Sequence, residues 1–330
     1  MSRTGTVVIA DFLADSEVEA PVLGPGVDLI VARAHREDDL ASTLAVADVI
    51  ILFHDIAAMT DSSLARAPRL KAVVRAGVGY NNVDLAAAGR RGIAVCNVPD
   101  YGTEEVADHA IAMLLSLVRH LPACDASVRR GEWDYATARE ATRLRGKTLG
   151  LVGCGRIGAA TALRAKAFGL DVVFYDPLVP SGLDKALGVR RSLELLPMLS
   201  GSDFVSLHCY LDPGSHALLD ARAFAAMRPG AILINTARGP VVDQAALIDA
   251  LDSGRLYAAG LDVFEREPLD DDRLRHHPRV LLSPHSAFYS KEGFVELRTK
   301  AAEEAARILD GRPPLNLVNR PQLVEPRAVV

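Results

Sequence analysis

The chain has 330 residues, a length that suggests roughly two domains. Hydrophobic residues make up 49% of the sequence and charged residues 24%, which excludes wholesale disorder. The formal net charge is −5 and no long stretch carries one sign, so we expect no direct binding of nucleic acid.

The four cysteines, Cys96, Cys124, Cys154 and Cys209, lie far apart and form neither a CxxC pair nor a spacing typical of metal ligands. We therefore expect reduced thiols and no metal site. The N-terminal apolar run is too short for a secretory signal, and the longest apolar run, 110–118, is well short of the roughly 20 residues that cross a bilayer. These features predict a soluble, cytoplasmic protein that does not bind a membrane.

The first hundred residues alternate between runs rich in Val and Ile and polar helical or turn segments. This alternation predicts a parallel sheet with helices packed on its faces. The expected strands are TVVIA (6–10), VDLIVA (27–32), ADVIILF (47–53), KAVVRA (71–76) and IAVCN (93–97).

A longer helix is predicted over 103–120, with Thr103 as its N-cap and two glutamates in its first turn. Apolar residues between Val106 and Val118 recur at helical spacing and form a wide stripe. Such a stripe usually belongs to the core and less often to a surface between subunits.

A second alternating series begins at Thr148, and a helix over 291–310 follows it. The two series predict two α/β domains. The expected strands of the second series are TLGLVG (148–153), DVVFYD (171–176), DFVSLHC (203–209), AILINTA (231–237), YAAGLDVF (257–264) and RVLLSPH (279–285).

Gly153, Gly155 and Gly158 match the pattern G-x-G-x-x-G between a predicted strand and a predicted helix, and Asp176 ends the next strand, 23 residues after Gly153. In a dinucleotide site the first glycine makes a tight turn, the second lets the backbone approach the pyrophosphate, and the third lets helix and strand pack closely. The amides at the helix start then receive the phosphates, and the acid receives the ribose. The sequence therefore predicts a dinucleotide site here.

Three polar residues, Arg238, Glu267 and His285, lie at or just beyond the ends of predicted strands. Ligands bind outside the carboxyl ends of such strands, so we expect these side chains to converge. A 2-oxo acid needs a cation for its carboxylate or carbonyl and a proton donor, and a carboxylate beside a histidine stabilises the protonated form. Taken singly, each residue has a plainer interpretation: a solvated arginine, a glutamate in a turn and a structural histidine.

At these residues the sequence resembles the D-isomer-specific 2-hydroxyacid dehydrogenases over essentially the whole chain. The matching stretches are RAGVGYNNVD (75–84), GCGRIG (153–158), NTARG (235–239), GLDVFEREP (260–268) and SPHSAFYS (283–290). Within the family, LRAKAFGLDVVFYDP (163–177) and PHSAFYSKEG (284–293) are most similar to the C-terminal-binding-protein branch. Phe288 departs from that branch, which has a tryptophan there.

The resemblance implies two Rossmann-like or flavodoxin-like domains with parallel sheets and the active-site cleft between them. The substrate domain is expected to be discontinuous, combining 1–100 with 289–330, and the NAD-binding domain to span 101–288. No extra regulatory domain is expected after the final helix.

The resemblance also assigns roles to residues. It makes Arg238, Glu267 and His285 the catalytic trio. The implied cofactor-binding residues are Val78, Gly153, Gly155, Arg156, Ile157, Gly158, Asp176, Cys209, Thr236, Ala237, Arg238, Asp262 and His285, with Asp262 meeting the nicotinamide carboxamide. The implied substrate-binding residues are His54, Arg75, Gly77, Val78, Gly79, Arg238, His285 and Phe288.

The implied activity is NAD-dependent interconversion of a small 2-oxo acid and the D-2-hydroxy acid. Family members commonly form homodimers through the cofactor domain, which favours the stripe at 106–118 as a dimer surface. The alternative is an NADH-sensing, peptide-binding regulator of the C-terminal-binding-protein kind. Oxidation of formate or phosphite is less favoured, because formate dehydrogenases have a glutamine at the position of Glu267.

The far end of the substrate is open to two interpretations. Arg75 and His54 follow two predicted strands, and together they would favour an anionic tail, namely a phosphate, phosphonate or second carboxylate. Alternatively, Arg75 helps only to position the common carboxylate and His54 is a solvated loop residue.

Overall fold

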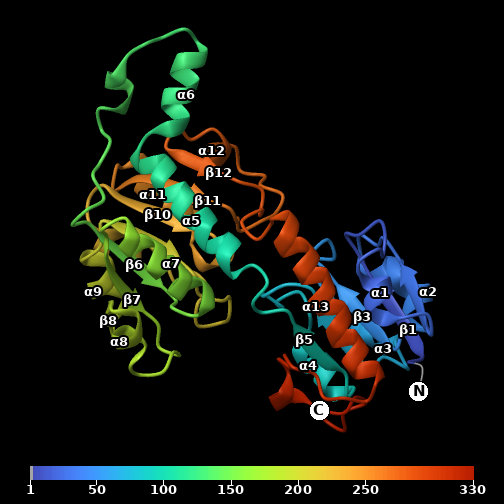
Figure 1. Cartoon of the computed structure of the whole chain (residues 1–330). Helices are drawn as coiled ribbons and strands as arrows, with labels where there is room; N and C mark the ends of the chain where they lie inside the picture. Colours follow the sequence, from blue (N-terminus) through green and yellow to red (C-terminus); the bar gives the residue numbers. More distant parts are fainter. Residues whose placement is uncertain (1–2) are drawn as a thin grey trace. The chain divides into compact units, whose positions relative to one another are not determined.

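The computed structural model describes residues 3–330, which form two compact units (Figure 1). The discontinuous unit combines the residues up to Gly102 with Ser290–Val330, and the continuous unit is Thr103–Tyr289. These boundaries differ by one or two residues from those expected from the sequence.

The discontinuous unit contains a five-stranded parallel sheet in the order β2-β1-β3-β4-β5. Its strands are β1 (Gly5–Ile9), β2 (Val27–Val31), β3 (Val49–Leu52), β4 (Ala72–Arg75) and β5 (Ala94–Asn97), and they match the five runs expected from the sequence. Every residue of β3 is buried, because an inner strand of a parallel sheet is covered on both faces and is apolar throughout. The edge strand β5 is also fully buried, and Asn319 from the C-terminal segment bonds to its backbone.

Helices from both ends of the chain cover this sheet. The longest, α13 (Lys291–Leu309), packs against α1 (Glu19–Leu23), β3 and β4. Ser290 caps it by accepting the Gly293 N–H at 2.8 Å, and a buried bidentate pair from Arg298 to Glu19, at 2.7 and 2.8 Å, fastens α13 to α1. The other helical segments are η1 (Glu37–Leu40), α2 (Ala41–Leu44), α3 (Asp61–Ala65), α4 (Leu85–Arg90) and η4 (Arg320–Gln322).

The segment after α13 is part of the core of the discontinuous unit. Asn319 is fully buried; its amide oxygen accepts the Val95 N–H at 2.8 Å and its amide nitrogen donates to the Ile93 carbonyl at 3.0 Å. The Gln322 backbone lies so close to Gly89 that a Cβ there would come within 2.2 Å of the Gln322 carbonyl oxygen.

The continuous unit contains a seven-stranded parallel sheet in the order β12-β11-β10-β9-β6-β7-β8. The order reverses at β6, which pairs with β7 on one side and β9 on the other. Open α/β sheets bind ligands beyond the carboxyl ends of the strands at such a reversal. The strands are β6 (Thr148–Val152), β7 (Asp171–Tyr175), β8 (Arg190–Ser192), β9 (Phe204–Leu207), β10 (Ala231–Asn235), β11 (Leu256–Leu261) and β12 (Val280–Leu282).

The prediction of two parallel-sheet α/β domains is therefore confirmed. Only β8 was missed, because it is a three-residue edge strand with the polar sequence RRS.

Helices cover both faces of the seven-stranded sheet: α5 (Thr103–Val118) and α7 (Arg156–Ala167) lie on one face, and α9 (Leu195–Ser200), α10 (Ala221–Ala226) and α11 (Gln244–Asp252) on the other. The remaining segments are α6 (Leu121–Arg129), η2 (Tyr135–Ala138), α8 (Leu183–Leu187), η3 (Gly239–Val241) and α12 (Asp272–Arg275).

Three expectations for α5 were wrong. Thr103 is the first helical residue, not the N-cap. The helix ends at Val118 because His120 adopts a left-handed conformation, with φ 55° and ψ 31°. Most of the apolar stripe at 106–118 is buried in the unit's own core, so the core interpretation is confirmed and the dimer-surface interpretation that the resemblance favoured is wrong.

Within residues 3–330 no single helix is long and apolar enough to cross a bilayer, although α5 and α6 together, bent by 61°, meet the length and composition criteria. The four cysteines are all free.

Candidate active site

The glycine-rich loop follows β6, and neighbouring backbone packs tightly against two of its glycines, Gly153 and Gly158. A Cβ on Gly153, whose φ is 91°, would lie 2.6 Å from the Cys209 backbone nitrogen, and one on Gly158 would lie 2.3 Å from the Gly153 carbonyl oxygen. A Cβ on Gly155 would meet nothing within 4 Å, so the loop is open where a pyrophosphate would approach. Arg156 and Ile157 begin α7, whose first amides lack partners within the helix. These features fit a dinucleotide.

Asp176 lies directly after β7, and its carboxylate holds two loops. One oxygen accepts the Cys154 N–H at 2.8 Å, and the other accepts the Leu178 N–H at 2.9 Å and the Val179 N–H at 3.3 Å. A carboxylate offers about four acceptor positions, so one position remains for a ribose hydroxyl. Contact with the ribose stays a prediction.

Arg191, on β8, was missed by sequence reasoning. It donates to the Asp176 carbonyl at 2.7 Å and the Val179 carbonyl at 3.1 Å, and it lies over the Phe174 ring at 5.7 Å. Arg191 therefore fixes the loop that follows the ribose-binding candidate.

The loop after β10 is held by Asn235, which sequence reasoning also missed. The Asn235 amide accepts the Ala237 N–H at 3.0 Å and donates to the Arg238 carbonyl at 3.1 Å. Thr236 lies between them, and its hydroxyl is buried without a hydrogen-bond partner among the described residues. It is thus a polar atom suited to a ligand, as the resemblance implies.

The same loop touches the one that carries Glu267. A Cβ on Gly239 would lie 1.8 Å from the Phe264 carbonyl oxygen, and the Phe264 N–H donates to Glu267 at 3.0 Å. Only glycine permits this approach.

Glu267 and His285 come together at this edge of the sheet. His285 Nδ1 lies 2.6 Å from Glu267 Oε2, and both side chains are half-buried. Burial alone raises the pKa of Glu267, but the hydrogen bond and charge of His285, with the charge of Arg238, bring it below its usual value. Glu267 is therefore ionised at neutral pH and can accept the hydrogen bond from His285.

Asp262, after β11, organises the loop around His285. Its buried carboxylate accepts the backbone N–H groups of Ser286 and Ala287 at 2.9 and 3.0 Å, and its carbonyl accepts the His285 N–H at 2.8 Å. The Phe288 ring packs edge-on to the His285 ring, with centroids 6.3 Å apart. Cys209 lies against Gly153, and burial raises the pKa of its thiol to about 11.

In the discontinuous unit, Arg75 and His54 lie at the same edge of the sheet, since Arg75 pairs in register with Leu52. Arg75 Nη1 donates to the Ala76 carbonyl at 2.6 Å and occupies the space that a side chain on Gly77 would need. The Val78 carbonyl, next to Gly79, accepts the Asn97 amide at 2.7 Å.

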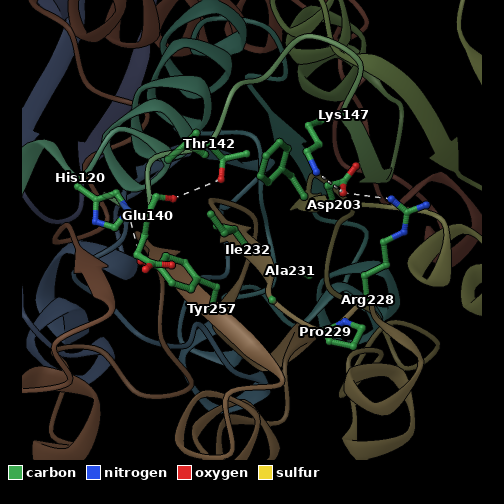
Figure 2. A pocket seen from close by; sticks show the side chains of 13 residues that line it. His120, Glu140, Thr142, Lys147, Asp203, Arg228, Pro229, Ala231, Ile232 and Tyr257 are labelled. Carbon is green, nitrogen blue, oxygen red and sulfur yellow. Dashed lines mark hydrogen bonds and ion pairs between the residues drawn. The ribbon is translucent and has the colours of Figure 1, made fainter. Parts of the chain in front are cut away.

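A separate cavity of about 220 Å³ lies near the amino ends of β9 and β10, away from the glycine-rich loop (Figure 2). Three of its charged side chains pair with one another, since Asp203 contacts both Lys147, at 3.4 Å, and Arg228, at 3.1 Å. None of the site residues expected from the sequence lines it. No group of three or more His, Cys, Asp or Glu side chains within residues 3–330 could hold a metal ion.

Residues 111–287 match the family model of the D-isomer specific 2-hydroxyacid dehydrogenases, NAD binding domain. The chain belongs to this family. The expected NAD cofactor is thereby confirmed, and the matched residues lie in the continuous unit.

Members of the 2-hydroxyacid dehydrogenase family are similar along most of the chain. A D-3-phosphoglycerate dehydrogenase of Mycobacterium bovis is 40% identical over 305 residues, which cover 92% of this chain and 57% of that protein. The chain thus spans little more than half of that relative's length.

Two solved structures share the fold. TT0316 protein from Thermus thermophilus has a TM-score of 0.85 and 34% identity, covering 95% of this chain and 99% of its own. D-lactate dehydrogenase from Aquifex aeolicus, complexed with NAD and lactic acid, has a TM-score of 0.81 and 29% identity, covering 92% and 96%. These similarities do not distinguish the C-terminal-binding-protein branch, which stays a prediction.

Proposed function

We propose that this protein is an NAD(H)-dependent oxidoreductase that interconverts a small 2-oxo acid and its D-2-hydroxy acid. The observation that carries the proposal is the 2.6 Å pair of His285 and Glu267, in the unit that carries the glycine-rich loop. When bound, NADH supplies the hydride. The similarity in fold to a D-lactate dehydrogenase complexed with NAD and lactic acid supports the same reaction class.

His285 acts as the general acid in reduction. Its Nδ1–H donates to Glu267, whose charge favours the imidazolium, so Nε2 carries the proton that goes to the oxo group. In oxidation the same nitrogen takes the hydroxyl proton. Arg238, held by Asn235 through its carbonyl, offers a planar guanidinium for the carboxylate or carbonyl of the substrate.

For the substrate tail we propose a second acidic group, of the phospho, phosphono or carboxylate kind, bound by Arg75 and His54. Arg75 ends β4 and His54 follows the paired strand β3, so both lie at the carboxyl ends of neighbouring strands, which supports this proposal. The 40% identity to a D-3-phosphoglycerate dehydrogenase supports it too. The backbone at Gly77, Val78 and Gly79 binds the substrate carboxylate.

The test is a panel of 2-oxo acids, followed by NADH absorbance, with wild type and Arg75→Met. Anionic-tailed substrates should exceed pyruvate at least tenfold in kcat/KM, since a charge-assisted hydrogen bond contributes about 1.5–3 kcal/mol. Arg75→Met should remove most of that preference. Equal losses for both kinds of substrate would limit Arg75 to the common carboxylate.

The same panel of 2-oxo acids distinguishes the dehydrogenase from the peptide-binding alternative. Binding of NADH without reduction of any 2-oxo acid would refute the dehydrogenase proposal and favour a regulator, which peptide arrays with and without NADH would then address.

We further propose a cytoplasmic homodimer that forms through the continuous unit. The segment that includes α6 and η2 projects from the rest of this unit (Figure 1) and exposes Leu121, Val128, Trp133 and Tyr135, the last two by 90% and 95%. Large exposed apolar side chains in one segment indicate a partner surface. Light scattering should show a dimer that Trp133→Ser with Tyr135→Ser converts to a monomer.

A further inference from the structure

A chain of hydrogen bonds runs from helix α5 to the loop of His285. His109 Nε2, on α5, lies 3.0 Å from the Ser283 hydroxyl, and that hydroxyl lies 2.5 Å from Asp262 Oδ1. His109 Nε2 is itself 3.8 Å from the same carboxylate oxygen. Three elements distant in sequence thus meet at one buried carboxylate.

The number of available protons fixes which group donates to which in this chain of hydrogen bonds. A serine hydroxyl has one proton, and its short contact with Asp262 shows that the proton is donated to the carboxylate. The Ser283 oxygen can then only accept from the imidazole, so His109 carries its proton on Nε2. The order is His109 to Ser283 to Asp262.

The Asp262 carboxylate, at the end of this hydrogen-bond chain, holds the backbone that follows His285, at Ser286 and Ala287. Ser283, which precedes His285 by two residues, bonds to the same carboxylate. His285 itself has a φ of 52°, a left-handed conformation that a residue with a side chain keeps only when its surroundings enforce it. The hydrogen-bond chain therefore supports the loop that carries His285.

We propose that His109 is a positioning residue that acts through Ser283 on Asp262, and so on the His285 loop and on the nicotinamide end of the NADH site. The inference rests on the proposed function for its catalytic consequence. Its effect on NADH binding needs only the NAD-binding domain.

The test compares two replacements of His109, one that keeps a hydrogen-bond donor and one that removes it. His109→Gln keeps an amide N–H near the position of Nε2, and His109→Leu removes it. The dissociation constant of NADH, measured by fluorescence titration, should rise about tenfold in His109→Leu and stay within about twofold of wild type in His109→Gln. Ser283→Ala, which interrupts the chain, should resemble His109→Leu, and the double variant should be little worse than either.

A matched control is His120→Leu, just beyond the same helix. His120 contacts Tyr257 at 3.3 Å at the separate cavity and should not affect NADH binding. Melting temperatures for every variant exclude general unfolding as the cause of a loss.

Two results would overturn the proposal: wild-type affinity for NADH in His109→Leu, or a His109→Gln protein as weak as His109→Leu. The two proposals can fail separately. If no 2-oxo acid is reduced but NADH affinity follows the expected pattern, only the proposed reaction fails. If reduction is normal and the variants bind NADH normally, only the positioning role fails.

Discussion

Glu267 accepts one hydrogen bond from His285 and another from the backbone of its own loop. In Glu267→Gln the imidazolium loses its carboxylate partner. We therefore expect the rate of 2-oxo acid reduction to begin to decline at a lower pH in this variant than in wild type. General acid catalysis contributes about 10² to 10⁴ in rate, so replacing His285 should cost that much. The pH profile of kcat/KM checks the shift.

The double variant of Glu267 and His285 provides the control. If the two residues act as one unit, it should be little slower than the worse single variant. Fully additive losses, or an unchanged pH profile in Glu267→Gln, would remove Glu267 from the mechanism.

Asp176 should decide which nicotinamide cofactor is used. A 2′-phosphate beside its carboxylate would place like charges together, so we expect NADH to be preferred over NADPH. Asp176→Asn removes the charge and keeps one of the two acceptor oxygens, and it should narrow the difference in kcat/KM between NADH and NADPH. Asp176→Ala should narrow this difference too, but at a greater cost in NADH affinity, because the Cys154 and Leu178 amides then both lose their acceptor. Equal kcat/KM for both cofactors in wild type would contradict this.

The site residues found from the sequence share one property: each lies in a motif or directly after an apolar strand. Glu267 and His285 could be expected to meet because carboxyl ends of parallel strands share an edge. Arg191 and Asn235 could not be found in this way. Their partners are backbone carbonyl and amide groups, which carry no residue signature, and β8 is too short and polar to predict.

At the scale of elements, the contact between the loops after β10 and β11 depends on Gly239. We expect Gly239→Ala to lower both kcat and the melting temperature, because its Cβ would overlap the Phe264 backbone, which cannot move without displacing Glu267. The cost should be about 1–3 kcal/mol of unfolding free energy or more.

Gly155→Ala is the matched control. Its Cβ would meet nothing within 4 Å, and the residue has a φ of −72°, so the melting temperature should be unchanged. NADH affinity should nevertheless fall, because the methyl group occupies the approach of the pyrophosphate. A stable, active Gly239→Ala protein would show that the loops are not coupled.

At the scale of the whole molecule, the two units have separate sheets and should respond separately to damage. Asn319→Ala leaves the Val95 N–H and the Ile93 carbonyl without their partner, at a cost of about 1–3 kcal/mol for each buried group. Hydrogen exchange should accelerate in β5 and the C-terminal segment but not in β6 to β12. The exposed Arg320→Ala variant should change neither, and uniform acceleration across both sheets would refute separate responses.

The alternation of apolar runs was sufficient to predict two parallel-sheet domains. Each buried strand of a parallel sheet is an apolar run of its own, so it can be recognised without knowing which strand it pairs with. Periodicity could not show that 290–330 joins the first sheet; only the resemblance implied it. The contacts responsible, such as Asn319 with Val95, join residues more than two hundred positions apart and leave no local pattern.

The split of the discontinuous unit has a consequence for synthesis on the ribosome. The first 102 residues contain all five strands of their sheet, but α13, which covers β3 and β4, is translated only after the whole continuous unit. During that interval an apolar sheet face awaits its helix, which makes this stage prone to aggregation and dependent on chaperones. A circular permutant that begins at Ser290 and joins Val330 to the original N-terminus would translate this unit without interruption. It should give a larger soluble yield when chaperones are limiting.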